Sequence, residues 1–148
     1  MIRPISLSDI DEVMDIWLKS NIKTHNFVAE KYWQDNYSTV KNEITQAEVY
    51  VYINDEDNNI LAFVGLVDDY IAGIFVKENA RSKGIGKKLL DYVKVLNSKL
   101  TLEVYAKNKR AIHFYEREKF VIQSQEIDKD TNEKEFTMIW VNSNKNDI

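Results

Sequence analysis

The chain has 148 residues, enough for one domain with a continuous core, and a formal net charge of −4 that argues against coating nucleic acid or anionic membranes. The sequence contains no cysteine, which excludes disulfide scaffolds, thiol nucleophiles and thiolate metal sites, and we expect no bound metal. No signal-peptide hydrophobic region follows Met1, which predicts a cytoplasmic protein without a membrane partner.

The first half of the chain predicts a strand, two helices and three further strands. Apolar residues at helical spacing predict a first helix over about 9–20 and a second one, with an aromatic face, around 33–44. Alternating or unbroken apolar runs predict the strands, of which the last three form an antiparallel meander. These strands are 2–6, 49–53, 60–67 and 70–76.

The second half returns to helical spacing after residue 84. It predicts helices from Gly84 to Leu96 and over 109–118, and strands over 100–105, 120–127 and 136–141. A frayed polar tail is expected at 142–148. The chain therefore reads as a single mixed α+β domain over residues 1–148.

Two of the four glycines, Gly84 and Gly86, open the helix that follows the strand 70–76. Residues 77–94 carry six basic and two acidic side chains, a local charge of +4 in an acidic protein. The first turn of a helix leaves backbone N–H groups unpaired, and glycine lets a ligand approach them closely. The segment therefore suits a phosphate group. A glycine-started helix with a solvated basic face explains the same spacing equally well.

Neither a P-loop nor a dinucleotide-binding fingerprint fits this turn. The remaining pattern is Arg-x-x-Gly-x-Gly at 81–86, followed by a strand and by Asn-x-x-Ala-x-x-Phe-Tyr at 108–115. This combination resembles the GNAT superfamily of N-acetyltransferases over nearly the whole chain. Trp17, Ser20 and the segment 24–27 are similar to small bacterial members. Many members have glycine where this chain has Lys119, which puts the turn before Phe120 in doubt.

The resemblance implies a mostly antiparallel sheet flanked by helices, with acetyl-CoA in a gap beside the strand 70–76. In the family this strand carries a bulge and splays from its neighbour, and Gly73 fits either that bulge or packing against a large side chain. Asn108 would contact the pantetheine arm, cap the following helix, or do both. The implied acetyl-CoA contacts are Phe75, Val76, Arg81, Ser82, Lys83, Gly84, Ile85, Gly86, Lys87 and Asn108.

Tyr115 matches the tyrosine that is the proposed general acid of this family, which would protonate the departing CoA thiolate. A phenol pKa near 10 and a thiol pKa near 8.5 make full proton transfer uphill by about 2 kcal/mol. Tyr115 would therefore stabilise the thiolate mainly by a hydrogen bond, unless its surroundings lower its pKa. The alternative is a core aromatic beside Phe114.

The attacking amine must lose a proton, because a lysine ammonium with a pKa near 10.4 is almost wholly protonated at neutral pH. Glu103, which interrupts the apolar strand 100–105, is the first candidate base, and a solvent-facing strand residue is the alternative. His25 is the second candidate, and Phe27 is expected beside the acceptor. Trp33 and Tyr37, by contrast, fit the core better than a substrate pocket.

We therefore expect direct transfer of an acetyl group from acetyl-CoA to a primary amine of a protein lysine, a protein N-terminus or a small molecule. A non-catalytic CoA-binding module on the same fold is the alternative, and Tyr115 favours the enzyme. Nucleic-acid binding through 77–94 is disfavoured by the net charge. The chain is expected to be a monomer or homodimer. Surplus acidic residues that faced the cleft would favour a cationic acceptor.

Overall fold

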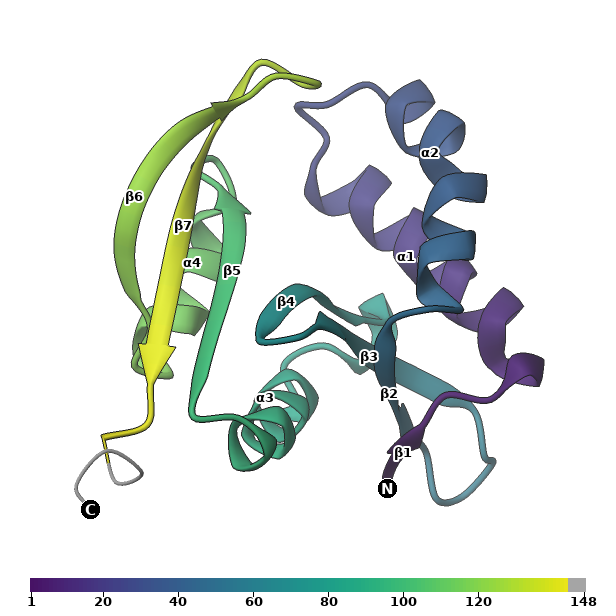
Figure 1. Cartoon of the computed structure of the whole chain (residues 1–148). Coiled ribbons are helices and arrows are strands. Elements are labelled where there is room, and N and C mark those ends of the chain that lie inside the picture. Colours follow the sequence, from purple (N-terminus) through teal and green to yellow (C-terminus); the bar gives the residue numbers. More distant parts are fainter. Residues whose placement is uncertain (144–148) are drawn as a thin grey trace.

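Within residues 1–143, which the computed structural model describes, seven strands pair into one sheet of order β1-β2-β3-β4-β5-β7-β6 (Figure 1). The strands are β1 (Ile2–Pro4), β2 (Glu48–Ile53), β3 (Ile60–Val67), β4 (Tyr70–Val76), β5 (Lys99–Tyr105), β6 (Val121–Asp128) and β7 (Glu133–Val141). The helices are α1 (Ile10–Thr24), α2 (Glu30–Ile44), α3 (Ile85–Leu96) and α4 (Lys109–Arg117). None of these helices is long and apolar enough to cross a membrane.

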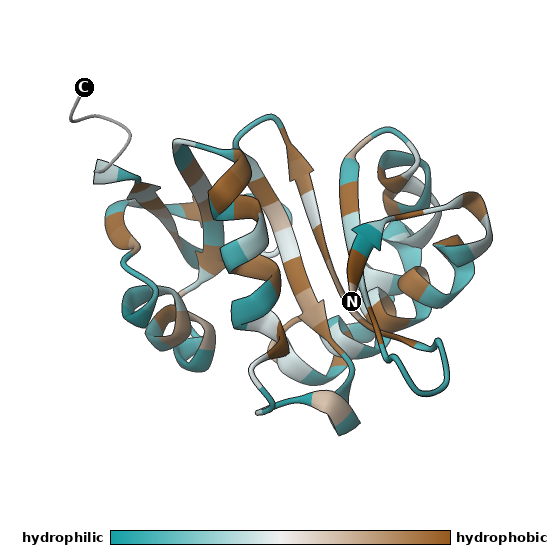
Figure 2. Cartoon of the chain, turned by 90° about the horizontal axis from the view of Figure 1, so that it is seen from below, coloured by the Kyte–Doolittle hydropathy of each residue, from teal (hydrophilic) through white to brown (hydrophobic). Residues whose placement is uncertain are grey.

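The sheet separates two apolar cores, each covered by a pair of helices (Figures 1 and 2). Helices α1 and α2 pack on one face, and α3 and α4 pack on the other. β3 is buried on both faces, as its unbroken apolar sequence predicts, with Val64 in one core and Phe63 in the other. The mixed, mostly antiparallel sheet flanked by helices confirms the expected fold class.

The strands β4 and β5 form the parallel pair of the sheet, and they separate after two residue pairs. Tyr70 pairs with Thr101 and Ile71 with Leu102, after which the two strands diverge. The register between β3 and β4 shifts at the same level, so that Ala72 is an unopposed bulge residue. The expected bulge and splay are therefore confirmed.

Gly73 follows this bulge and lies under the ring of Phe75. A Cβ atom at this position would approach Cε2 of Phe75 to 2.3 Å, a distance that real contacts do not reach. The Phe75 ring in turn stacks on Phe63 of β3, with ring centroids 5.2 Å apart. Both interpretations of Gly73 hold, since the bulge adjoins it and the ring requires it.

Several element boundaries differ from those expected from the sequence, among them the end of α1, the end of β1 and the start of β7, which begins at Glu133 and not at residue 136. α1 continues four residues past the expected end, and its last turn is closed by the backbone N–H of His25, which donates to the carbonyl of Asn21 at 2.8 Å. β1 ends at Pro4, which has no N–H to donate. Lys119 adopts a left-handed φ of 74°, the conformation that glycine favours. The turn before Phe120 therefore has the backbone conformation expected of glycine, although its residue is a lysine. The expected tail at 142–148 lies, from residue 144 on, outside the described residues.

Candidate active site

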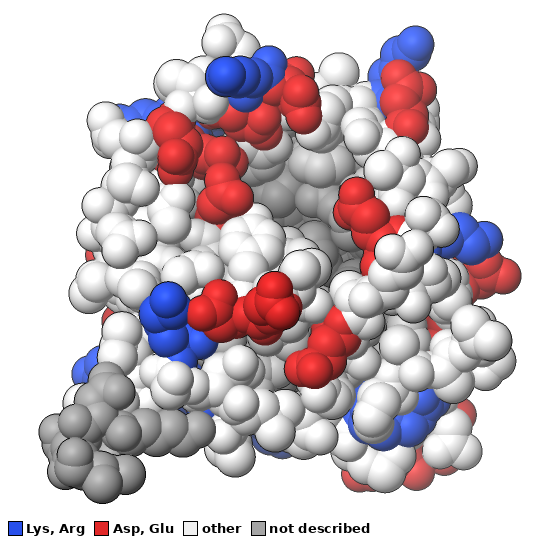
Figure 3. All heavy atoms as spheres, viewed as in Figure 1, with Lys and Arg blue, Asp and Glu red and all other residues white. Residues whose placement is uncertain are grey.

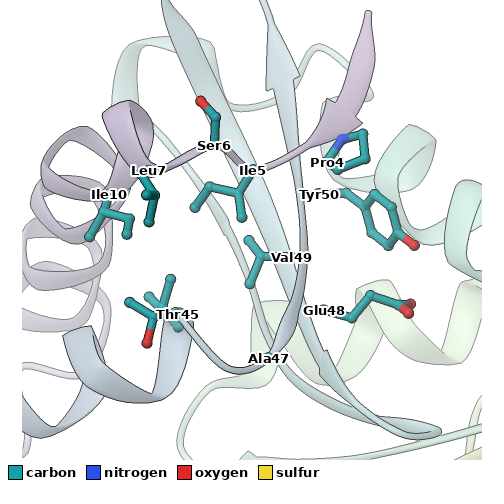
Figure 4. Close-up of a pocket in the computed structure, with 11 residues that line it drawn as sticks. Pro4, Ile5, Ser6, Leu7, Ile10, Thr45, Ala47, Glu48, Val49 and Tyr50 are labelled. Carbon is teal, nitrogen blue, oxygen red and sulfur yellow. The ribbon is translucent and has the colours of Figure 1, made fainter.

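Two cavities stand out among the described residues, and the larger of these two gathers chemically useful groups. It has a volume of about 860 Å³ and lies between the end of α1, β4, the segment 80–87 and α4. The smaller cavity, of about 330 Å³, lies against β1 and β2 (Figure 4). Its lining is mostly apolar, with Glu48 as the charged side chain. The larger cavity, called the cleft below, is therefore the candidate active site.

The N-terminus of α3 opens into the cleft without a side-chain cap. Gly84, with a φ of 77°, is the N-cap residue and has no side chain to bond the free N–H groups. The first helical residues, Ile85, Gly86 and Lys87, line the cleft, and their N–H groups have no partner within the helix. Ser82 is also left-handed, with a φ of 65°, which places backbone strain in the same loop. The loop presents donors and partial positive charge to an anion.

Two arginines add full charges beside these donors. Arg81 donates to Oγ1 of Thr24 at 2.9 Å, and Arg110 donates to Oγ of Ser82 at 3.2 Å. Burial, and then the charge of Arg110, lower the pKa of Arg81. Neither arginine forms an ion pair with a carboxylate among residues 1–143, whereas Lys87 pairs with acidic side chains. The cleft therefore carries unneutralised positive charge.

Helix α4 forms the opposite wall and carries Tyr115. The Tyr115 side chain is buried against Phe114 and Phe120, with ring centroids 5.1 and 5.5 Å away, and it lines the cleft. Burial raises the pKa of its phenol. Tyr115 is therefore both a core aromatic and a neutral hydrogen-bond donor at the cleft. Asn108 caps the same helix, because its Oδ1 accepts from the N–H of Ala111 at 3.2 Å.

Glu103 projects from the other face of β5, toward the side of the sheet that α1 and α2 cover. Its Oε1 accepts a hydrogen bond of 2.9 Å from the hydroxyl of Tyr70, beside the point where β4 and β5 separate. Burial, and then the neighbouring Glu103, raise the pKa of Glu135 to about 7. The two carboxylates therefore share a site in which a proton is held near neutral pH.

Further carboxylates lie beside this pair on β6 and the turn after it. Burial and then Asp128, Asp130 and Glu135 raise the pKa of Tyr32 on α2, so these carboxylates face α2. Figure 3 shows a hollow on this face with acidic side chains around it. We call this group the acidic wall; it consists of Glu103, Glu126, Asp128, Asp130 and Glu135.

His25 lines the cleft at the end of α1 and is surrounded by aromatic rings. Its ring lies 5.0 Å from that of Tyr105, and Phe27 packs edge-on against both rings. Burial lowers the pKa of His25 to about 4, so the imidazole is neutral at neutral pH. Trp33 is buried against the same cluster, in agreement with its expected core position.

Most of the residues predicted from the sequence lie together in the cleft. Lys83, Glu103 and Phe27 lie outside its lining: Lys83 is exposed, Glu103 belongs to the acidic wall and Phe27 packs on Tyr105. The predicted residues that line the cleft are His25, Phe75, Val76, Arg81, Ser82, Gly84, Ile85, Gly86, Lys87, Asn108 and Tyr115.

Sequence reasoning missed a second set of lining residues. Arg110, His113 and Arg117 recur every three to four positions on α4, a spacing that puts them on one helix face. That periodicity was available in the sequence, but nothing in it indicated that this face lines the cleft. Asn21 was missed because it reads as an ordinary helical residue. No group of His, Asp and Glu within residues 1–143 is arranged to hold a metal ion.

Comparisons with known proteins identify the family. Residues 10–120 match the model of the acetyltransferase (GNAT) family. The chain is 33% identical to the peptidyl-lysine N-acetyltransferase YiaC of Escherichia coli, over 95% of this chain and 96% of that protein. The peptidyl-lysine N-acetyltransferase YjaB of Salmonella typhimurium is 27% identical over 80% of this chain and 81% of its own length.

The fold is shared as well. The solution structure of apo YjaB from Escherichia coli has a TM-score of 0.84 to this chain at 22% identity, over 95% of this chain and 97% of that one. The splayed strands β4 and β5 and the helix that begins after Gly84 are the features that the resemblance to this family predicted. The family match, the similarity to YiaC and the shared fold point to the same family. The chain therefore belongs to the GNAT family of acetyltransferases, which transfer the acetyl group of acetyl-CoA to an amine.

Proposed function

We propose that the chain acetylates lysine side chains of proteins or peptides, and that the acidic wall selects this cationic acceptor. The observation that carries the proposal is the set of carboxylates on the side of the sheet opposite the arginine-lined loop. A lysine ammonium with a pKa near 10.4 arrives positively charged, and negative potential raises its local concentration. The names of YiaC and YjaB, both peptidyl-lysine N-acetyltransferases, support the same acceptor class.

The donor half of the cleft fits acetyl-CoA. The free N–H groups of Ile85, Gly86 and Lys87 would hold its pyrophosphate, with Arg81 and Arg110 neutralising the charge. Backbone groups of Phe75 and Val76, on the splayed side of β4, would bind the pantetheine arm together with Asn108. When bound, acetyl-CoA supplies an activated thioester carbonyl for direct attack by the amine.

Tyr115 acts as a hydrogen-bond donor to the leaving sulfur. Because burial raises its pKa above the ordinary phenol value, the hydroxyl keeps its proton throughout the neutral range. Complete transfer of that proton to a thiolate with a pKa near 8.5 is correspondingly more uphill. A neutral donor held in a buried position stabilises developing negative charge without giving up its proton.

The carboxylates of Glu103 and Glu135 take the proton of the attacking ammonium, directly or through water. Glu103 is held by Tyr70 beside the strand separation, and Glu135 has a pKa of about 7. A base whose pKa lies near the working pH combines availability with proton affinity. His25, with a pKa of about 4 and both ring nitrogens in hydrogen bonds, is the poorer base.

No observation favours a non-catalytic CoA-binding module. Tyr115, the residue that such a module could lose, lines the cleft. Nucleic-acid binding through 77–94 loses support, since Lys87 is neutralised by Asp91 and Glu118. The cytoplasmic location, the monomeric or homodimeric state and the absence of membrane and nucleic-acid partners stay predictions.

The acceptor class is tested by thiol release from acetyl-CoA with peptides that carry one lysine and a blocked N-terminus. We expect a peptide with arginines beside the lysine to give a kcat/KM roughly tenfold above that of a peptide with glutamates there, because the acidic wall repels the latter. A peptide with acetylated lysine is the control. Turnover of free α-amines or polyamines but of neither lysine peptide would contradict the proposal.

Tyr115→Phe should lower kcat about 100-fold, the usual loss for one donor to a developing anion. The dissociation constant of CoA, measured by calorimetry, should stay within about threefold, because the phenyl ring keeps its contacts with Phe114 and Phe120. Tyr92→Phe, a tyrosine of α3 that packs on Tyr50, serves as the control. Equal losses of kcat and CoA affinity would make Tyr115 a packing residue only.

Glu135→Gln should stabilise the fold above pH 7. Because the folded-state pKa is raised from 4.5 to about 7, the native protein holds a proton that the unfolded chain has released. The free energy of unfolding of the wild type therefore falls as the pH rises between these values. The variant lacks this loss and should be more stable by about 1 kcal/mol at pH 8, after allowance for solvent screening.

Urea denaturation at pH 4 and pH 8 measures this difference. The advantage of Glu135→Gln should vanish at pH 4, where the wild-type carboxyl is protonated in both states. An advantage of the same size at both pH values would show that the substitution acts through packing and not through the shared proton.

A further inference from the structure

A line of hydrogen bonds crosses the cleft from α1 to α4. Asn21 is 3% exposed, and its Nδ2 donates to the carbonyl of Trp17 at 3.0 Å. This bond fixes the amide, so that its Oδ1 faces Nδ1 of His25 at 2.9 Å. On the far side of the ring, Nε2 of His25 lies 3.2 Å from Nδ2 of Asn108. Trp17 and Asn21 of α1 are thus connected to Asn108, the N-cap residue of α4, through the imidazole of His25.

The donor and acceptor of each bond follow from the ends of this line. Oδ1 of Asn21 can only accept, so Nδ1 of His25 carries the hydrogen. The neutral ring then has an acceptor at Nε2, which matches the donating Nδ2 of Asn108. Asn108 confirms this orientation from its other end, because its Oδ1 accepts from the N–H of Ala111. Every group therefore has one consistent role.

The ring cannot easily leave this position. Its centroid lies 5.0 Å from that of Tyr105, 5.6 Å from that of Trp33 and 5.7 Å from that of Phe27. These aromatic side chains come from α2, β5 and the segment between α1 and α2. His25 is thereby held as a rigid acceptor directed at Asn108.

We propose that His25 is a positioning residue, which fixes the side-chain amide of Asn108 and thereby sets α4 against α1 across the cleft. The inference rests on the proposed function, in which Asn108 contacts the pantetheine arm. The fixed amide has one more N–H and one more lone pair to offer. Holding them in one orientation before binding lowers the entropy cost of engaging acetyl-CoA, and it positions the helix that carries Tyr115.

Two substitutions of His25 separate its two hydrogen bonds. In His25→Gln, the longer side chain can bring an amide oxygen to the place of Nε2 and accept from Asn108. In His25→Asn, the shorter side chain can bring an amide nitrogen to the place of Nδ1 and donate to Asn21. We expect His25→Asn to raise the dissociation constant of CoA and the KM of acetyl-CoA about tenfold, and His25→Gln to change both by less than about threefold.

A double-mutant cycle with Asn108→Ser distinguishes positioning from packing. Serine retains the cap to Ala111 but does not reach His25, so the two His25 variants should bind CoA equally well in this background. If His25 only fills the aromatic cluster, His25→Asn would lose the same affinity whether Asn108 is present or not. That additivity, or a His25→Asn variant that binds CoA like the wild type, would overturn the proposal.

A third measurement needs neither a variant nor turnover. In the wild type at neutral pH, the ¹⁵N resonances of the His25 ring should show a protonated Nδ1 and an unprotonated Nε2. A protonated Nε2 would overturn the proposal even if the enzyme acetylates lysine. Absence of turnover with normal CoA binding and the expected resonances would instead count against the acceptor assignment alone.

Discussion

The separation of β4 from β5 is the constraint on which the rest of the molecule depends. After Ile71 and Leu102 the two strands no longer pair, so the backbone groups of β4 that face β5 lack the partners a continuous sheet would supply. The bulge at Ala72 and the absence of a side chain at Gly73 let β4 turn away while Phe75 still packs on Phe63. An extended ligand with amide groups can complete this edge as an additional strand would.

Charge is divided between the two sides of this opening. The formal charge of −4 describes neither side, since the proposed donor side gathers arginines and the proposed acceptor side gathers carboxylates. Arg81 lies close enough to Arg110 for that charge to lower its pKa, and neither arginine has a carboxylate partner among the described residues. Burial and the neighbouring Glu103 raise the pKa of Glu135. Such arrangements cost stability and are typical of sites that bind charged ligands. An anionic substrate beside the arginines and a cationic substrate beside the carboxylates would relieve the repulsion in each group.

The sequence predicted what depends on local pattern. The strands β3 and β4 have the predicted bounds. At Lys119 the sequence left the turn in doubt, and the structure shows there the left-handed conformation that a glycine would adopt. The sequence could not show which helix faces meet, because this depends on packing between distant segments. The arginine face of α4 and the buried Asn21 were therefore missed, and Lys83 and Phe27 were expected nearer the cleft than they lie. Glu103 was singled out because it interrupts an apolar strand, but its partner Glu135 is adjacent only through the pairing of β5 with β7.

Residue-resolved hydrogen exchange with and without CoA tests the central account, that the strand separation and the start of α3 form the donor site. We predict slower exchange on CoA binding for the N–H groups of 74–76 and 85–87, which line the cleft. The exchange of the N–H groups that line the smaller cavity beside β1 and β2 should not change. Protection confined to that smaller cavity, or unchanged exchange at 85–87 in a sample saturated with CoA, would contradict the account.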